Sequence, residues 1–304
     1  MWVILPLTVL LLTACAASSD IPTWFDSIQR TLVKTVQVQG HRMAYLDAGK
    51  GHPVILIHGF GGSMWQWEYQ QPALSAVHRV ITPDLLGSGL SDKPDLAYTP
   101  TEMVELFREF MDRVGVQRAT LVGNSIGAGL AIGMALTYPD RVDRLVLISG
   151  FPDRVREKLR SPMFRRAVDS WVPIWLARLG NWLAGRWLTR DVLSEVVYDR
   201  GLLTPAVIER SYLNRRQPGL IPPLLTLMRN LPLWEEGFAR RLSQVRSPTL
   251  IVWGAEDRLF PPQVGRDLHA ALPGSSFALI PEAGHIPQWE RPDEVNRVLL
   301  NFLR

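Results

Sequence analysis

The sequence predicts an α/β fold in which a mostly parallel, doubly wound sheet carries a helical cap insertion. Short apolar runs of strand length alternate with helical stretches over residues 31–150 and again over residues 242–304, which is typical of parallel strands joined by crossover helices. The segment 151–241 has helical periodicity broken by prolines and no strand pattern. With 47% hydrophobic and 20% charged residues, the chain of 304 residues has the composition of a globular protein with a sizeable core.

The first core part, residues 31–150, opens with a predicted hairpin. Its strands, Val33–Val38 and Arg42–Leu46, flank the turn Gln39-Gly40-His41. Continuous apolar runs follow, as expected for parallel strands that are buried on both faces. These runs lie at Val54–Ile57, Arg79–Thr82, Ala119–Val122 and Arg144–Ile148.

Helices are predicted between these strands. Thr101 is expected to cap a helix that ends at about Arg113, and the small residues of Ala128–Leu136 predict another. The second core part, residues 242–304, repeats the alternation with strands at Thr249–Trp253 and Phe277–Ile280 and helices near Pro262–Leu272 and Pro292–Leu303. The insertion at 151–241 holds five of the eleven tryptophans and is interpreted as a cap between two sheet strands.

The N-terminal residues have the pattern of a targeting segment. Trp2–Ala17 is an apolar run without charge, long enough for a signal-peptide core but shorter than the ~20 residues of a bilayer span. The only cysteine lies at the end of this run, in Leu12-Thr13-Ala14-Cys15, which resembles the lipobox of bacterial lipoproteins. That resemblance implies a signal peptide over 1–14, a lipidated Cys15 with a tether over 15–30, and a membrane-anchored lipoprotein on the periplasmic or surface side of the cell envelope. An uncleaved hydrophobic anchor with an incidental cysteine is the alternative.

The net charge of +4 hides an asymmetry along the chain. Residues 151–247 hold 17 Lys and Arg against 9 Asp and Glu, a balance that favours anionic membrane surfaces or acidic ligands. No basic-aromatic nucleic-acid motif is present, so nucleic acid is not an expected partner. One cysteine and six histidines without ligand spacing argue against a sequence-local metal site, and no organic cofactor is expected.

One motif predicts a nucleophile. Gly123-Asn124-Ser125-Ile126-Gly127 follows the predicted strand Ala119–Val122 and opens the small-residue helix. This is G-x-S-x-G in a strand–turn–helix setting, where a sharp, strained turn exposes the serine hydroxyl at a helix N-terminus. Ser125 is therefore the candidate nucleophile.

A serine nucleophile needs a base, and the base needs an acid that orients it. His285 comes just after the last predicted strand, and Asp257 just after the preceding one. The carboxyl ends of parallel strands share one rim of a sheet, so both residues are expected beside Ser125. Glu256 competes for the role of the acid, but neighbouring side chains point apart, which favours Asp257.

A third motif, His58-Gly59-Phe60-Gly61-Gly62, follows the Val54–Ile57 strand. Acyl transfer builds negative charge on a carbonyl oxygen, and one prealigned donor contributes on the order of 3 kcal/mol. The backbone N–H groups of Phe60 and Ile126 are the predicted donors. A phosphate-binding loop is the alternative, but the spacing matches neither G-x-G-x-x-G nor a Walker A loop.

Together these motifs resemble the α/β-hydrolase superfamily from about Val33 to the end of the chain. The loops at 83–94 and 284–292 resemble those of a capped branch with epoxide hydrolases, haloalkane dehalogenases, carbon–carbon bond hydrolases and small bacterial lipases. The first two use an aspartate nucleophile, which Ser125 excludes. Carbon–carbon hydrolases share Gly-Asn-Ser but usually carry tryptophan where this chain has Ile286. The H-G-F-G-G and G-N-S-x-G pair is most similar to family V lipases and monoacylglycerol lipases, which often have glycine where this chain has Ala128.

This resemblance implies a membrane-anchored serine carboxylesterase or lipase that hydrolyses fatty acyl esters or lipids through an acyl-enzyme on Ser125. The cap residues Trp175 and Trp182 are expected to line the acyl pocket, with simple packing as the alternative, and the cap arginines to meet anionic headgroups. Three alternatives stay open: a carbon–carbon hydrolase of dienoic diketone acids (meta-cleavage products), a perhydrolase or haloperoxidase side activity, and a non-catalytic ligand-binding member of the fold.

Overall fold

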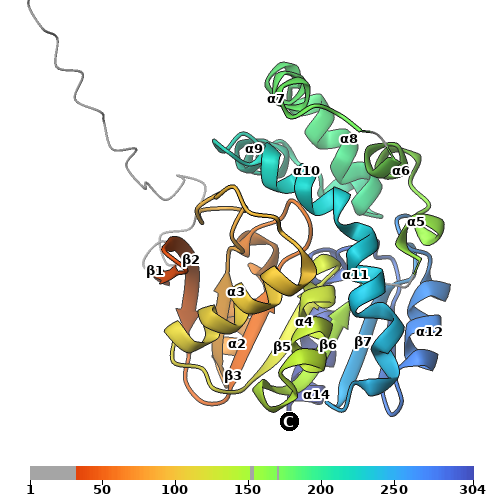
Figure 1. Ribbon diagram of the computed structural model, residues 1–304. Coiled ribbons are helices and arrows are strands. Elements are labelled where there is room, and N and C mark those ends of the chain that lie inside the picture. The colour runs from red at the N-terminus through yellow and green to blue at the C-terminus, as the bar shows by residue number, and fades with distance from the viewer. Residues whose placement is uncertain (1–31, 151–153, 170) are drawn as a thin grey trace, which may run out of the picture.

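The computed structural model describes residues 32–150, 154–169 and 171–304 (Figure 1). In these residues, eight strands form one sheet in the order β1-β2-β4-β3-β5-β6-β7-β8. The pairs β1/β2 and β2/β4 are antiparallel, and all later neighbours are parallel. The strands are β1 (Val33–Val38), β2 (His41–Ala48), β3 (Pro53–Ile57), β4 (Arg79–Pro83), β5 (Ala119–Asn124), β6 (Val142–Ile148), β7 (Thr249–Gly254) and β8 (Ser276–Ile280).

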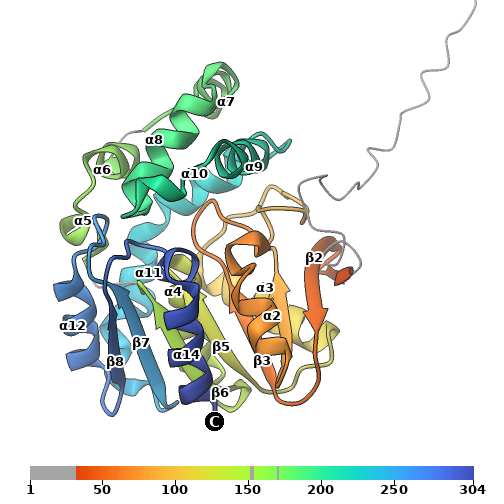
Figure 2. The ribbon, with the colours of Figure 1, turned by 180° about the vertical axis from the view of Figure 1, so that it is seen from behind.

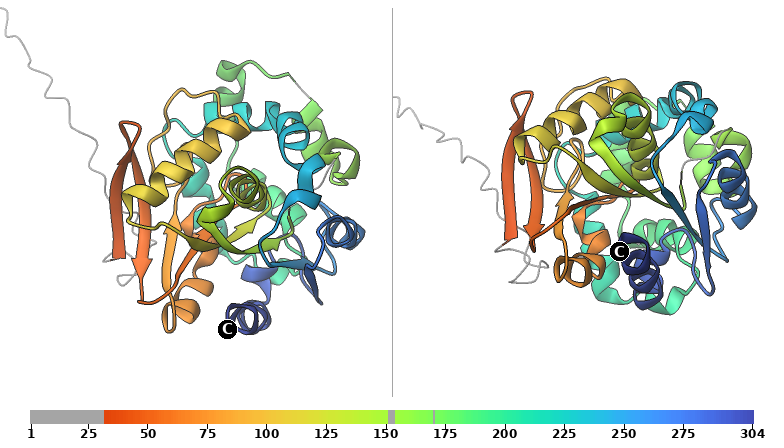
Figure 3. Two further views of the ribbon diagram at one scale, coloured as in Figure 1. Left: turned by 60° about the horizontal axis from the view of Figure 1, so that its bottom comes forward. Right: turned by 90° about the horizontal axis from the view of Figure 1, so that it is seen from below.

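Helices cover both faces of this sheet (Figure 3). One layer consists of α3 (Pro100–Arg113), α4 (Ile126–Thr137) and α12 (Pro262–Ala271), and the other of α2 (Gln70–Ser75) and α14 (Pro292–Leu303). Leu130 of α4 packs in the core on the first face, and Leu299 of α14 packs in the core on the second. Strands β3 and β5 are mostly apolar, as expected for strands whose side chains are buried on both faces.

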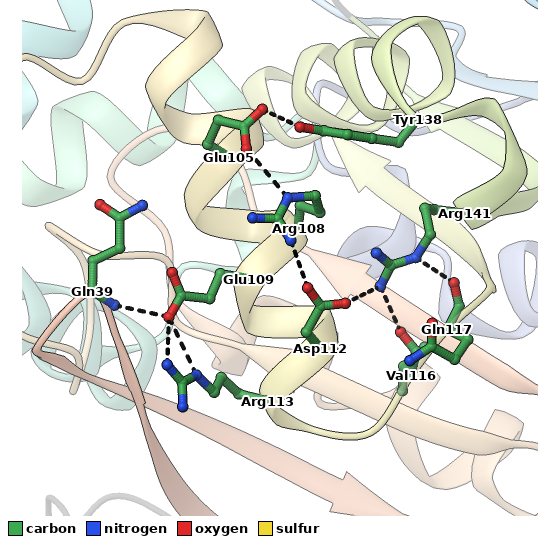
Figure 4. A network of polar contacts seen from close by, with 10 residues as sticks. All are labelled: Gln39, Glu105, Arg108, Glu109, Asp112, Arg113, Val116, Gln117, Tyr138 and Arg141. Carbon is green, nitrogen blue, oxygen red and sulfur yellow. Dashed lines mark hydrogen bonds and ion pairs between the residues drawn. The ribbon is translucent and has the colours of Figure 1, made fainter.

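The solvent-facing side of α3 carries a network of ion pairs (Figure 4). Arg108 donates to Glu105 (3.2 Å) and Asp112 (2.6 Å), one turn before and after it. Arg141, from the turn before β6, reaches the same Asp112 (2.6 Å) and the carbonyl of Val116 (3.0 Å). Exposed pairs of this kind contribute about 0–1 kcal/mol each, so the network joins neighbouring elements more than it stabilises the fold.

The cap is inserted between β6 and β7 and lies over the carboxyl ends of the parallel strands (Figures 1 and 2). Its helices are α5 (Val155–Lys158), α6 (Pro162–Asp169), α7 (Ile174–Leu183), α8 (Arg186–Val196), α9 (Pro205–Arg215), α10 (Ile221–Arg229) and α11 (Leu231–Gly237). Arg210 of α9 forms a two-pronged ion pair with Glu68 of the core, both contacts at 2.8 Å. The indole of Trp289 donates to the same carboxylate (2.8 Å), so cap and core meet at a bonded cluster.

The predicted α/β class is confirmed, and every predicted strand is present. One helix start was predicted wrongly: Thr99, not Thr101, caps α3 by accepting the N–H of Glu102 (3.3 Å). Pro100 takes the first helical position, where its missing N–H has no cost. The predicted targeting segment, including Cys15, lies outside the described residues. Among those that are described, no helix combines the length and apolarity that crossing a bilayer requires.

Candidate active site

Ser125 lies at the turn between β5 and α4 with a backbone φ of 54° and ψ of −117°. The flanking glycines make this turn possible because no side chain fits there. A Cβ on Gly123 would lie 2.3 Å from the carbonyl carbon of Gly127, and one on Gly127 would lie 2.4 Å from the carbonyl oxygen of Ile57. The local strain thus presents the hydroxyl at the N-terminus of α4, as a nucleophile elbow requires.

Asp257 and His285 are joined by a 2.8 Å hydrogen bond between Asp257 Oδ2 and His285 Nδ1. The other carboxylate oxygen accepts two backbone N–H groups of the following loop, at 2.9 and 3.0 Å, which fixes the orientation of the carboxylate. Glu256 accepts the N–H of Ala283 instead (3.0 Å). The structure therefore brings Asp257, and not Glu256, to the imidazole.

Ser125 and His285 line the same cavity, although no hydrogen bond joins Ser125 Oγ to the imidazole among the described residues. Such bonds often tighten only in the substrate complex. Asn124 Nδ2 donates to the carbonyl of His285 (3.1 Å), and the N–H of His285 donates to the carbonyl of Val196 at the end of α8 (2.8 Å). Asn124 and the cap thus hold the base in place. The sequence analysis missed both contacts, although Asn124 lies inside the serine motif.

The loop Gly59–Gly62 runs directly beside the serine turn. A Cβ on Gly59 would lie 2.8 Å from Asn124 Oδ1 and 3.4 Å from Ser125 Cβ, so only glycine allows this approach. The N–H of Gly59 donates to Gln66 Oε1 (2.9 Å), which fixes the course of the loop. No motif in the sequence pointed to Gln66, because its partner is a backbone group seven residues away.

Phe60 and Ile126 carry the N–H groups predicted to bind an oxyanion. Neither N–H group has a hydrogen-bond acceptor among the described protein groups, and the first turn of a helix leaves the N–H of Ile126 unpaired in any case. Phe60 also lines the cavity that holds Ser125. Both donors are therefore free to stabilise negative charge next to the nucleophile.

Two buried ionisable side chains, those of His58 and Asp84, accept hydrogen bonds from backbone N–H groups of the loops around the site. His58 Nε2 accepts the N–H of Leu85 (3.1 Å), and burial lowers the pKa of His58 to about 4, so the ring is neutral. Asp84 accepts the N–H groups of Met64 and Leu90, both at 2.6 Å. Burial raises the pKa of Asp84 to about 6. Asp84 was assigned no role from the sequence, although it comes two residues after the predicted strand Arg79–Thr82.

Ser125 and His285 open into a cavity of about 410 Å³ between core and cap. Apolar cap side chains form much of its wall, including Met163, Phe164, Leu188, Val192, Leu224 and Met228. Polar side chains of α9 form one end: Ser211 and Asn214 are buried, and Ser211 Oγ and Asn214 Oδ1 have no hydrogen-bond partner in the described part of the chain. The cavity thus suits an apolar molecule with a polar group.

Arg215 also lines this polar end, and histidine aside it is the one cationic side chain in the described lining. Its guanidinium donates to Thr189 Oγ1 (3.1 Å), the carbonyl of Ala184 (2.7 Å) and the carbonyl of Asn181 (3.2 Å). Burial lowers the pKa of Arg215, but an arginine remains charged in this setting. Arg215 therefore adds positive potential to the cavity without a carboxylate partner among the described residues.

The prediction that Trp175 and Trp182 line the pocket is corrected by the structure. Both side chains lie on α7, at 67% and 65% exposure, and neither belongs to the cavity wall. Helices α6, α8 and α10 supply the wall instead, so α7 is separated from the cavity by the helices around it. Separately, no group of three or more His, Cys, Asp or Glu side chains in the described residues is placed to hold a metal ion.

Comparison with known proteins places these features in a family. A family model described as alpha/beta hydrolase fold matches residues 52–292. A 2-hydroxy-6-oxo-6-phenylhexa-2,4-dienoate hydrolase from Burkholderia cepacia is 30% identical over 267 residues, which cover 84% of this chain and 89% of that protein. A 2-hydroxy-6-oxononadienedioate/2-hydroxy-6-oxononatrienedioate hydrolase from Comamonas testosteroni is 29% identical, with 84% and 89% covered. The solved structure of a meta-cleavage product hydrolase from Pseudomonas fluorescens IP01 matches with a TM-score of 0.76 and 29% identity, over 89% of this chain and 97% of that one.

These relatives contradict the predicted lipase function and the likeness to family V lipases, both of which are wrong. The misleading loops, H-G-F-G-G and G-N-S-x-G, carry the oxyanion donors and the nucleophile. Ester and carbon–carbon hydrolysis both need these groups, so the loops cannot distinguish the two reactions. What the loops do predict is the superfamily, and the match over residues 52–292 shows that the chain belongs to the alpha/beta hydrolase fold family.

Proposed function

We propose that this enzyme hydrolyses a carbon–carbon bond beside a ketone in acidic dienes of the 2-hydroxy-6-oxo-2,4-dienoate class. The observation that carries the proposal is the likeness, over 84% of the chain at 30% identity, to an enzyme named for 2-hydroxy-6-oxo-6-phenylhexa-2,4-dienoate. The Asp257–His285 pair beside Ser125 supports it, because the reaction needs a nucleophile and a group that moves protons.

The chemistry constrains how such a bond can break. Carbon is a poor leaving group, so the bond between C5 and C6 breaks only when its electron pair can be delocalised. In the 2,6-dioxo tautomer, the pair left on C5 spreads through the C3–C4 double bond to the oxygen on C2. Addition of water across C5–C6 then gives a carboxylic acid and a 2-hydroxypenta-2,4-dienoate.

In this proposal, Ser125 Oγ attacks the C6 carbonyl while His285 accepts its proton and Asp257 holds the imidazolium. The developing oxyanion lies between the N–H groups of Phe60 and Ile126. When the C5–C6 bond breaks, its electron pair moves through the diene to the C2 oxygen, which takes up the proton that His285 accepted from Ser125, and 2-hydroxypenta-2,4-dienoate leaves. Water activated by His285 then frees the acid from Ser125. His285 can serve in both proton transfers because its position is fixed from both sides, by Asp257 and by the cap carbonyl of Val196.

The cavity supports a defined orientation of the substrate. Apolar side chains such as Phe164 and Leu188 suit the substituent on C6, and the α9 end suits the acidic end of the diene. There, Arg215 supplies positive charge and the unpartnered hydroxyl of Ser211 can donate a hydrogen bond. Ile286, which lines the cavity directly after the base, leaves more room than a tryptophan would.

The test is the hydrolysis of 2-hydroxy-6-oxo-6-phenylhexa-2,4-dienoate in ¹⁸O-labelled water, with Ser125→Ala as the control. We expect loss of the dienolate absorbance, equal amounts of benzoate and 2-hydroxypenta-2,4-dienoate, and ¹⁸O in the benzoate carboxylate. The Ser125→Ala variant should be folded and inactive. Folded wild-type enzyme that leaves this diene and its 6-alkyl analogues intact while hydrolysing simple aryl esters would contradict the proposal.

A further inference from the structure

Helix α7 is an apolar helix that lies against α10 but buries none of its residues. Its ten residues, Ile174–Leu183, include only one charged side chain, Arg178, and none of the ten is buried. A soluble domain normally turns such a helix toward its core, and a large exposed apolar patch normally marks a contact site. The most exposed apolar residues here are Trp171, Trp175, Leu176, Leu179, Trp182, Leu183 and Trp187; these seven form what we call the α7 surface.

The cap bonds α7 chiefly through backbone carbonyls near its ends, and also through the side-chain oxygen of Asn181, which accepts from Arg215. Arg216 donates to the carbonyl of Trp182 (2.9 Å), and Arg215 to those of Asn181 (3.2 Å) and Ala184 (2.7 Å). These contacts satisfy carbonyls at the helix C-terminus, where positive charge is also favoured by the helix dipole. At the other end, Arg229 donates to the carbonyl of Val172 (2.9 Å). The helix is therefore fixed by both ends with its apolar side chains turned outward.

The segment that carries this surface contains basic but no acidic residues. Residues 171–190 contain three arginines and no Asp or Glu. Arg186 is paired with Glu209 of α9, whereas Arg178 and Arg190 have no ion-pair partner among the described residues. Four of the side chains in this segment are tryptophans, each more than 60% exposed. Tryptophan and leucine next to arginine, without acidic residues, is the composition of helices that lie in the headgroup region of anionic membranes.

The position of α7 leaves this surface accessible. It lies at the end of the cap furthest from the sheet (Figures 1 and 2). The helices on either side of it in the chain, α6 and α8, supply Phe164 and Leu188 to the wall of the active-site cavity. A flat surface that touched α7 would therefore lie just outside the apolar wall of that cavity.

From these observations we infer that the α7 surface docks on the headgroup region of an anionic lipid bilayer. The tryptophan and leucine side chains enter the interface, and Arg178 and Arg190 meet lipid phosphates. A second copy of the chain fits this surface less well, because a two-fold contact sets the same patch against itself and so faces arginines with arginines. The inference concerns where the enzyme works and does not depend on which bond it cleaves.

The test is hydrogen exchange of the full-length protein, read on the backbone amides of residues 171–187. Vesicles of phosphatidylglycerol and phosphatidylcholine in equal parts are compared with vesicles of phosphatidylcholine alone. We expect the anionic vesicles to slow exchange in this segment by about tenfold or more, and high salt to reverse the effect. Because the readout is local, binding through another part of the chain leaves it unchanged.

Leu179→Asp, on the α7 surface, should abolish this protection. Val77→Asp, at an exposed position just before β4 and at the opposite end of the sheet from the cap, is the matched control and should retain it. Exchange that is the same with and without anionic vesicles overturns the inference. Protection that grows with protein concentration in the absence of vesicles also overturns it and identifies a second copy as the occupant.

Discussion

In the core, surface arginines meet carboxylates, whereas in the cap Arg215 and Arg216 meet backbone carbonyls at the end of α7. Arg108 and Arg141 pair with acidic side chains along α3 (Figure 4). The core arginines are therefore paired with nearby carboxylates. Arg215 and Arg216 of the cap instead hold the C-terminal end of α7 and keep their positive charge without a neutralising carboxylate among the described residues.

The core elements around the nucleophile are more deeply buried than helix α7 of the cap. Every residue of β5 is buried, and the strand leads straight into the strained turn at Ser125. Helix α7 in the cap has no buried residue. Strain of one to a few kcal/mol persists only where the surroundings hold it firmly, so the core is suited to carry the nucleophile and the cap to shape the cavity. The predictions below test that division.

The largest expected effect comes from a core residue that orients the base. In Asp257→Asn, the side chain still reaches His285 but favours the wrong imidazole tautomer, so kcat should fall by about 10⁴-fold. Glu256→Gln is the matched control, because Glu256 accepts only the N–H of Ala283. This variant should lower kcat by less than about tenfold. Steady-state kinetics with 2-hydroxy-6-oxo-6-phenylhexa-2,4-dienoate as the substrate measure kcat for both variants. Equal losses in the two variants would show that the core does not select between the two acids.

The second effect is on stability, through buried His58. Its pKa is about 4 in the folded protein and 6.5 in the unfolded chain, so the unfolded chain binds the extra proton between these values. The contribution of the neutral ring is complete above pH 6.5 and is lost as the pH falls toward 4, by about 3 kcal/mol in total. The raised pKa of Asp84, about 6, acts in the opposite sense: its contribution is present below 3.8 and is lost as the pH rises through 6.

His58→Gln therefore leaves the opposing effect of Asp84 in place. Relative to the wild type, this variant should gain in free energy of unfolding as the pH falls through the window, as measured by urea titration at each pH. His269→Gln, at an exposed position on α12, is the control and should follow the wild-type slope. A His58→Gln variant whose slope also follows the wild type would show that His58 does not titrate as its burial requires.

The third effect tests the joint between the regions. Glu68 is only 20% exposed and its partner Arg210 is 15% exposed, so Glu68→Gln should lower the free energy of unfolding by about 2 kcal/mol. Glu209→Gln, which breaks the exposed pair with Arg186 inside the cap, should cost about 0.5 kcal/mol or less. Chemical denaturation measures both. A small loss in both variants would mean that contacts other than the Glu68–Arg210 pair hold the cap to the core.

The core could be predicted from the sequence because its physical constraints act over short distances along the chain. Strands buried on both faces appear as continuous apolar runs, and the elbow needs glycines at fixed positions around Ser125. Asp257 was favoured over Glu256 because adjacent side chains point apart. The start of α3 was misplaced by two residues because Thr99 and Thr101 flank the same proline and both can cap a helix.

The cap could not be predicted to the same depth. Tryptophans at helical spacing indicate an apolar face but not what that face meets, so Trp175 and Trp182 were placed inward and lie outward. Ser211 and Asn214 reach the cavity only through tertiary packing of α9. The reaction was missed for a related reason: the motifs describe the nucleophile and the oxyanion donors, whereas the choice between ester and carbon–carbon bonds depends on the cavity that the cap completes.

The smallest effect compares one substitution in two helices. Replacing a glycine inside a helix by alanine gains about 1 kcal/mol where there is room for the methyl group. Gly180, in α7, has open space around its Cβ position, so Gly180→Ala should stabilise the protein by about that amount.

In α4, a Cβ on Gly133 would lie 2.7 Å from Val104 Cγ2 and 2.8 Å from Phe238 Cε2. Overpacking costs typically about 1–3 kcal/mol, which exceeds the gain, so Gly133→Ala should destabilise by about 1 kcal/mol. A rise in the thermal unfolding midpoint for Gly180→Ala and a fall for Gly133→Ala would confirm the contrast between a packed core and an open cap surface. Stabilisation in both variants would show that α4 yields as readily as α7.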